Sequence, residues 1–258
     1  MTLDHARRFF IRALTLARAE FAVLAALMVA AIGVMTFAEV ADDMTEADGQ
    51  AFDQWVLAAM RPYADDPGRP WGPWWLKEAA ADITSLGGIS VLGLFALIVI
   101  LFLLSQRKWL SSVLLAAGLA GGVALSEGLK AVFERERPPL AARAVETINA
   151  SFPSGHALLS TVFYLSVAVM LTRAFPRRRF KVFVLGVGVV LAVLVGLTRV
   201  YLGAHWASDV LAGWAVGAAW AMVLWLIAHA AARFQKTHHA PLQDAPSPVD
   251  PDADPTKV

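Results

Sequence analysis

The sequence predicts an all-α, polytopic membrane protein, a bundle of six transmembrane helices. Hydrophobic residues make up 58% of the 258 residues and charged residues only 17%, whereas an average soluble domain has roughly 45–50% and about 25%. Mean hydropathy is +0.58. A helix needs about 20 apolar residues to cross a bilayer. Six stretches meet that length: 19–41, 83–104, 109–133, 154–174, 181–200 and 206–230.

The first stretch follows a basic start, which is also typical of a signal peptide. The apolar run from Phe21 to Val40 is longer than the core of a signal peptide, and further spans follow, so we expect an uncleaved first helix. One membrane domain over residues 1–233 then accounts for all six spans. The segment 234–258 is rich in Pro and Asp and is expected to be a disordered tail.

Lysine and arginine collect in four short segments, which predicts the orientation of the chain. These segments are the N-terminus, the 104–109 turn, the 173–181 turn and the start of the tail. With six spans all four lie on one side, and short loops rich in Lys and Arg face the cytoplasm. We therefore expect both termini to be cytoplasmic, in a cytoplasmic (inner) membrane.

The connection 42–82 is acidic and lies on the opposite, extracytoplasmic side of the predicted bundle. Phe52, Val56 and Met60 recur at helical spacing, which predicts a short amphipathic helix at the membrane interface. Several prolines and glycines between residues 62 and 73 then interrupt regular structure. The connection fits a loop that lies on the membrane, and it also fits a lid over the polar residues at this side.

Ionisable and small polar residues gather at the extracytoplasmic ends of the last four spans. Such residues are costly to keep in or near a bilayer unless they have partners or a function. Their convergence on one side predicts a single site. They are Lys130, Arg137, Ser154, Gly155, His156, Arg199, His205 and Asp209.

These residue types are suited to a phosphate group. Arg137 and Arg199 can each donate two parallel hydrogen bonds to phosphate oxygens, and Lys130 adds a compact charge. Ser154 and Gly155 begin a predicted helix, whose free N–H groups favour an anion. Because three cations are present and no cluster of carboxylates is visible, no metal or other cofactor is expected. The absence of cysteine excludes disulfides and thiolate chemistry.

Two histidines divide the predicted chemistry. His205 and Asp209 are four residues apart and share one helix face, so the carboxylate can hold one ring nitrogen while the other attacks phosphorus. His156 is the candidate general acid for the leaving oxygen. Glu127, one turn before Lys130, is expected to pair with that lysine and hold its position.

Three motifs carry a resemblance to a known family. Lys-x(6)-Arg-Pro at 130–138, Pro-Ser-Gly-His at 153–156 and Arg-x(5)-His-x(3)-Asp at 199–209 resemble the signatures of the type-2 phosphatidic acid phosphatases. The resemblance implies a metal-independent lipid phosphatase in a six-helix bundle, with the residue roles given above. Thr198 stands where the family signature usually has Ser. Threonine keeps the hydroxyl group of serine, so we include Thr198 as a secondary site residue.

The predicted function is hydrolysis of a lipid phosphate or diphosphate at the extracytoplasmic face, through a phosphohistidine intermediate. Undecaprenyl diphosphate is the leading substrate, and phosphatidylglycerophosphate, phosphatidic acid and lipid A phosphates are alternatives. A lipid phosphotransferase would use the same site. The expected partners are the bilayer and the lipid substrate. Nucleic acid is not expected because the net charge is only +1, and the sequence selects no oligomeric state.

Overall fold

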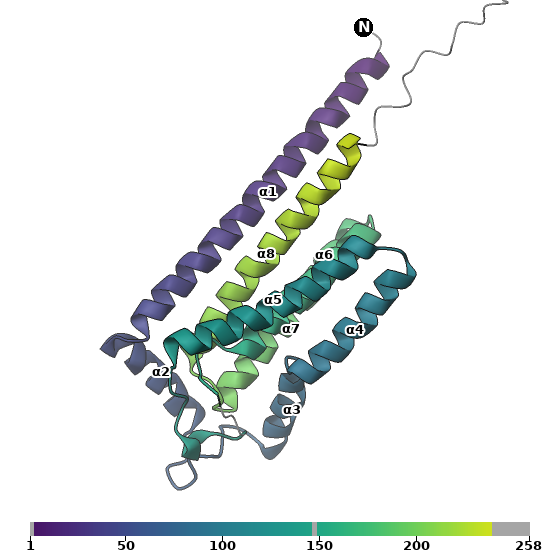
Figure 1. Cartoon of the computed structure of the whole chain (residues 1–258). Coiled ribbons are helices and arrows are strands. Elements are labelled where there is room, and N and C mark those ends of the chain that lie inside the picture. The colour runs from purple at the N-terminus through teal and green to yellow at the C-terminus, as the bar shows by residue number, and fades with distance from the viewer. Residues whose placement is uncertain (1–2, 146–148, 239–258) are drawn as a thin grey trace, which may run out of the picture.

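The computed structural model describes residues 3–145 and 149–238 of the chain, and every regular element within them is helical. Figure 1 shows the arrangement. The predicted all-α fold is therefore confirmed. The elements are α1 (Leu3–Asp43), α2 (Ala47–Met60), α3 (Trp74–Ser85), α4 (Ile89–Ser105), α5 (Trp109–Phe133), the 3-10 helix η1 (Leu140–Ala142), α6 (Gly155–Ala174), α7 (Arg178–Tyr201) and α8 (Ala207–His238).

Five helical segments are each long and apolar enough to cross a membrane. They are Glu20–Asp43 within α1, the helices α5, α6 and α7, and Ala207–Phe234 within α8. Helices α3 and α4 pass the same test only as a pair, which is bent by 46°. The described residues therefore contain five spans, or six if the bent pair counts as one.

The sequence predicted one continuous span at 83–104. In the structure this stretch consists of α4 and the last residues of α3, and a break separates the two helices. A Cβ at Gly87 would lie 2.3 Å from Val195 Cγ1, so only glycine lets the chain approach α7 this closely. Glycines are a common cause of sharp bends in helices. The Tyr164 hydroxyl donates to the carbonyl of Leu86 at 2.9 Å, so this oxygen beside the break keeps a hydrogen bond.

A matched pair of glycine substitutions tests this origin of the bend. Gly87→Ala should lower the free energy of unfolding by about 1–3 kcal/mol, since the new methyl overlaps Val195 and comes within 3.4 Å of the His156 ring. Gly93→Ala, within α4, adds a methyl to open space and should be neutral or stabilising by up to about 1 kcal/mol. Thermal unfolding of both variants in detergent measures the difference. Equal stability would contradict the close contact at Gly87.

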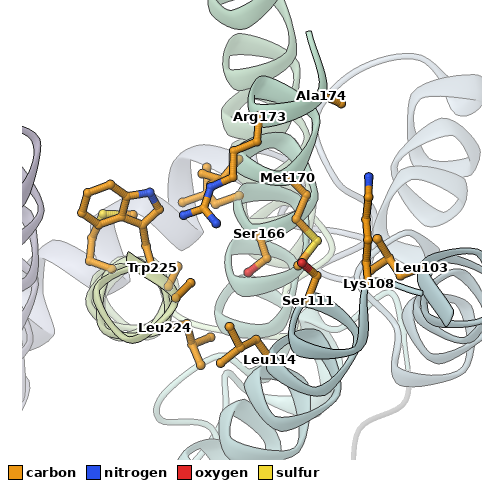
Figure 2. Close-up of a pocket in the computed structure, with 15 residues that line it drawn as sticks. Leu103, Lys108, Ser111, Leu114, Ser166, Met170, Arg173, Ala174, Leu224 and Trp225 are labelled. Atoms are coloured by element: carbon orange, nitrogen blue, oxygen red, sulfur yellow. The ribbon is translucent and has the colours of Figure 1, made fainter. Parts of the chain in front are cut away.

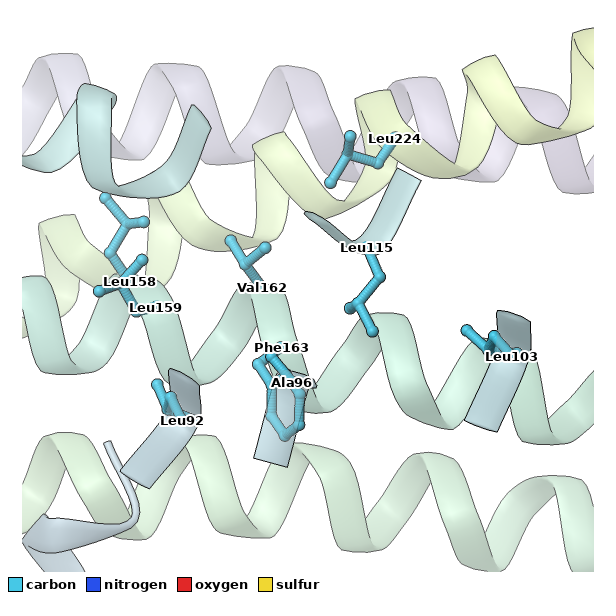
Figure 3. Packing of buried hydrophobic residues seen from close by; sticks show 9 residues of the cluster. All are labelled: Leu92, Ala96, Leu103, Leu115, Leu158, Leu159, Val162, Phe163 and Leu224. Atoms are coloured by element: carbon cyan, nitrogen blue, oxygen red, sulfur yellow. The ribbon is translucent and has the colours of Figure 1, made fainter. Parts of the chain in front are cut away.

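Helix α6 forms the centre of the bundle and packs against α4, α5, α7 and α8. Figure 3 shows the buried apolar side chains that converge on it. Since lipid is as apolar as these side chains, close packing rather than exclusion of water holds the helices together. The cluster consists of Leu92, Ala96, Leu103, Leu115, Leu158, Leu159, Val162, Phe163 and Leu224.

The spacing Gly213-x(3)-Gly217 on α8 brings two helix backbones together. A Cβ at Gly213 would lie 2.7 Å from the Ser154 carbonyl, and one at Gly217 would lie 2.8 Å from the Leu158 carbonyl. Small residues at this spacing are typical of tightly packed membrane helices. The contact sets the N-terminal part of α8 against the start of α6, and these two segments carry Ser154, Gly155, His156 and Asp209.

The helices at both ends of the chain extend beyond the predicted spans, although the candidate span Glu20–Asp43 agrees with the predicted 19–41. Helix α1 begins at Leu3 and lies along α8 (Figure 1), and Glu20 pairs with Arg233 at 3.0 Å between them. The predicted tail was expected to begin at 234, but α8 continues to His238. The remainder of that predicted tail, residues 239–258, lies outside the described part of the chain.

Candidate active site

A pocket of about 460 Å³ lies where α5, α6, α7 and the bend between α3 and α4 meet. Most of the predicted site residues line it, together with Asn149, which the sequence analysis missed. Asp209, Ser154 and Thr198 lie outside this lining. The predicted residues that line the pocket are Glu127, Lys130, Arg137, Gly155, His156, Arg199 and His205.

The two ring nitrogens of His205 have different neighbours, as their predicted roles require. Its Nδ1 lies 3.4 Å from Asp209 Oδ2, and its Nε2 lies 3.2 Å from Arg137 Nη1. Both partners of the His205–Asp209 pair are almost fully buried. With Nδ1–H directed at the carboxylate, Nε2 accepts from Arg137 Nη1, and a phosphate that took this donor would leave the Nε2 lone pair facing the pocket.

Burial also decides the charge of this ring. It lowers the pKa of His205 from 6.5 to about 4, while the hydrogen bond to Asp209 opposes the shift. The imidazole is therefore neutral at pH 7, as a nucleophile must be.

The ionisation of His205 is testable by nitrogen NMR on protein labelled in its histidine rings. At pH 5.5 an exposed histidine is about nine-tenths protonated, whereas His205 should still show the shifts of a neutral ring. The His205 signals are assigned by their loss in His205→Gln, and the unfolded protein serves as the control that titrates near the ordinary pKa. Imidazolium shifts for His205 at pH 5.5 in the folded protein would contradict the buried, neutral ring.

Asp209 is held by more than the histidine. Arg135 Nη1 donates to its Oδ1 at 2.6 Å, and the Ser151 hydroxyl donates to Oδ2. The backbone N–H of Trp206 donates to Oδ2 at 2.9 Å, an arrangement in which a side chain in the first turn satisfies an N–H at the helix start. These contacts fix the orientation of the carboxylate behind His205.

Arg135 connects this carboxylate to a second one. Its Nη2 donates to Asp53 Oδ2 at 2.6 Å, and Asp53 comes from α2, in the connection predicted to lie on the membrane. Asp53 also accepts hydrogen bonds from the backbone N–H of Ser208 at 3.0 Å and from the Ser208 hydroxyl. A carboxylate at the start of α8 is favoured by the helix dipole. Helix α2 is thus docked on the bundle by a buried ion pair, with Asp53 only 2% exposed.

Sequence reasoning missed Asp53, Arg135, Ser151 and Asn149 as site residues. Asp53 left a recognisable signal, because it is the only charged residue between 50 and 60, within an apolar helical pattern. Arg135 resembled any other charge in a loop. Its partners are 82 and 74 residues away in the chain, so no local pattern reveals them.

Arg199 is a buried cation with unused hydrogen-bonding capacity. It is 5% exposed, and its Nη1 contacts the Thr84 hydroxyl at 3.4 Å. Within the described residues its Nε has no hydrogen-bond partner. A buried guanidinium requires an anion or further acceptors, and a phosphate in the adjoining pocket would supply both.

Lys130 and Arg137 complete the cationic lining. Lys130 is buried and donates to Glu127 Oε1 at 2.7 Å, the pairing that their spacing predicts. Arg137 donates to the carbonyls of Asn149 and Ala204 at 2.6 and 2.7 Å. These contacts hold the Arg137 head group beside Nε2 of the histidine.

The remaining predicted residues have more local contacts. The Ser154 N–H donates to the Asp209 carbonyl at 2.9 Å, and its buried hydroxyl has no partner within the described residues. Gly155 leaves room for the Ser126 side chain, since a Cβ there would lie 3.0 Å from Ser126 Oγ. The Thr198 hydroxyl donates to the Val195 carbonyl at 2.6 Å, so the structure directs it into its own helix rather than into the pocket.

Comparison with known proteins identifies relatives of this chain. The sequence model of the PAP2 superfamily matches residues 109–233. Phosphatidylglycerophosphatase B of Bacillus subtilis is 35% identical over 144 residues, which cover 55% of this chain and 70% of the relative. Undecaprenyl-diphosphatase of Sulfolobus acidocaldarius is 32% identical over 122 residues, which cover 45% of this chain and 55% of the relative.

The fold agrees as well. The crystal structure of a transmembrane PAP2-type phosphatidylglycerolphosphate phosphatase from Bacillus subtilis matches with a TM-score of 0.72 at 28% identity. The match covers 80% of this chain and 98% of that one. The resemblance carried by the three motifs is therefore confirmed: this chain belongs to the PAP2 superfamily and is a membrane lipid phosphatase.

Proposed function

We propose that this phosphatase hydrolyses a lipid phosphate or diphosphate through a phosphohistidine at His205. One observation carries the proposal: His205 lines the same pocket as Lys130, Arg137 and Arg199, while its Nδ1 faces the fixed carboxylate of Asp209. The cations can neutralise a phosphoryl group in line with Nε2, which is the requirement for phosphoryl transfer.

The proposed reaction has two steps. In the first, His205 Nε2 forms a bond to phosphorus, and the bond from phosphorus to the bridging oxygen breaks as His156 donates a proton to that oxygen. The dephosphorylated lipid leaves. In the second step His156 accepts a proton from water, the water oxygen bonds to phosphorus, and the bond to Nε2 breaks to release inorganic phosphate. Asp209 keeps the ring oriented and stabilises its positive charge in both steps.

The substrate we favour carries a second phosphate next to the one that is removed. A second phosphate beside the one at His205 would add charge-assisted contacts with the cations that line the pocket. In undecaprenyl diphosphate an anhydride bond joins the two phosphates. In phosphatidylglycerophosphate a glycerol unit joins them. The first remains our leading substrate. The second is supported by the similarity to the Bacillus subtilis phosphatidylglycerophosphatase.

We place the catalytic pocket at the extracytoplasmic face and both termini in the cytoplasm. The support is the charge at the two ends of the bundle. Arg107 and Lys108 precede α5, and the 173–181 turn carries five further cations, all at the end opposite the pocket. Short loops rich in Lys and Arg face the cytoplasm.

Release of phosphate from a panel of lipids tests the proposed substrate class. Undecaprenyl diphosphate and phosphatidylglycerophosphate should show kcat/KM values about tenfold or more above those of phosphatidic acid and undecaprenyl monophosphate. A tenfold difference corresponds to the free energy of one charge-assisted hydrogen bond. Equal values would contradict the role of a second phosphate. Phosphate that appears on another lipid instead of in solution would show a phosphotransferase.

A further inference from the structure

A second pocket lies at the other end of the bundle from the catalytic one. We call it the distal pocket, of about 340 Å³, lined by residues of α5, α6 and α8 and the end of α4. Arg173 and His156 are 17 residues apart on α6, so the two pockets are separated by about 26 Å at a rise of 1.5 Å per residue. The distal pocket therefore has no part in the phosphoryl chemistry.

The distal pocket combines apolar walls with cations. Figure 2 shows Arg173 reaching from α6 toward Trp225, with Ser111 and Ser166 around the space below. Lys108, the residue directly before α5, also lines the pocket. Leucine side chains form part of the apolar wall: Leu103, Leu114, Leu165 and Leu224.

The charge of this region is unbalanced. A neighbouring cavity of about 650 Å³ shares Val169, Arg173 and Trp225 with the distal pocket and adds Lys181 and Arg233. No acidic residue lines either cavity within the described part of the chain. Glu20 neutralises Arg233 at 3.0 Å, but Lys108, Arg173 and Lys181 make no ion pair with any described residue.

We propose that the distal pocket binds one anionic phospholipid of the membrane leaflet opposite the catalytic site. Its phosphate would lie beside Arg173 and Lys108, and an acyl chain would cover the leucine wall. Basic pockets between membrane helices bind anionic head groups. A zwitterionic lipid would bring its own cation against these side chains, and inorganic phosphate would leave the apolar wall uncovered. The hydroxyls of Ser111 and Ser166 can donate to the ester oxygens of a glycerolipid.

The test compares lipid retention by the full-length, delipidated protein in detergent. Native mass spectrometry should show phosphatidylglycerol bound to the unmodified protein about tenfold or more better than phosphatidylcholine, and the double variant Lys108→Gln/Arg173→Gln should lose this preference. The matched control is Arg177→Gln/Arg179→Gln, which removes the same charge at the same end but outside both cavities. The control should keep the preference.

A second variant keeps the test independent of charge. Ser166→Phe should fill the distal pocket and lower retention of phosphatidylglycerol by a similar factor. Hydrolysis of a water-soluble phosphate monoester should remain within about threefold of the unmodified protein in all these variants, which shows that each is folded. Phosphatidylglycerol has no terminal phosphate and cannot be consumed as a substrate.

Three results would overturn the proposal. The first is equal retention of the two lipids by the unmodified protein. The second is an equal loss in the control and the double variant. The third concerns the acidic segment 239–258, which contains Asp244, Asp250, Asp252 and Asp254. If its deletion raised lipid affinity about tenfold, this segment rather than a lipid would be the pocket's ligand.

Discussion

His205→Ala should lower kcat by a factor of about 10⁴ or more, the scale on which loss of a nucleophile acts. Among the histidines whose side chains the structure describes, His205 has one ring nitrogen held by Asp209 and the other beside Arg137, so we expect no other histidine to replace it. The variant should still fold, since removing an uncharged ring leaves Asp209 paired with Arg135 and Ser151.

Phosphate release from the purified variant measures this effect, with thermal unfolding as the check on folding. His229→Ala is the matched control, because His229 lies near the other end of α8 and outside the catalytic pocket. It should retain activity within about threefold. Chelators should leave the unmodified enzyme unchanged. Full turnover by His205→Ala, or a strict requirement for Mg²⁺, would refute the phosphohistidine mechanism.

Arg135→Ala should destabilise the protein by about 3–5 kcal/mol, the cost of removing one partner from a buried ion pair. The substitution leaves two carboxylates, Asp53 and Asp209, without their shared cation, and they are 2% and 0% exposed. It should also reduce kcat more than it raises KM, because Asp209 loses its fixed orientation while the cations that line the pocket remain. We regard Arg135 as a positioning residue, since it acts on His205 through Asp209.

Denaturant or thermal unfolding in detergent, together with steady-state kinetics, tests this role. Arg69→Ala is a control that removes an exposed arginine from the same side of the bundle. A double-mutant cycle is sharper: Asp53→Asn should cost much less stability in the Arg135→Ala background than in the unmodified protein. Additive effects would show that the Asp53–Arg135 contact carries no coupling, and the proposed docking of α2 would then fail.

The motif residues could be predicted because their spacing is local. Lys130 and Arg137, or His205 and Asp209, lie within a few residues of one another, and hydropathy alone places them at span ends. The bend between α3 and α4 was missed because Gly87 and Gly88 resemble other glycines in an apolar run. What makes Gly87 necessary is its contact with Val195, about a hundred residues later in the chain.

The docking of α2 shows the same limit. The apolar spacing of Phe52, Val56 and Met60 predicts a helix, and a helix is present. Its position depends on Asp53, whose partners are Arg135 and Ser208. Neither can be inferred from α2 itself, and a surface helix with two acidic residues, Asp48 and Asp53, is compatible with many positions.

By itself the sequence determined the helical membrane fold, the three motifs that carry the family resemblance and the identity of the histidine that faces a carboxylate, because hydropathy and helical periodicity act over one or two turns. Only the tertiary structure decided how that carboxylate is held, why the second span bends beside the pocket, and where a second cationic cavity forms. Those features depend on contacts between residues roughly 60 to 155 positions apart. Such contacts leave no periodic pattern in the sequence, since helix packing alone brings the partners together.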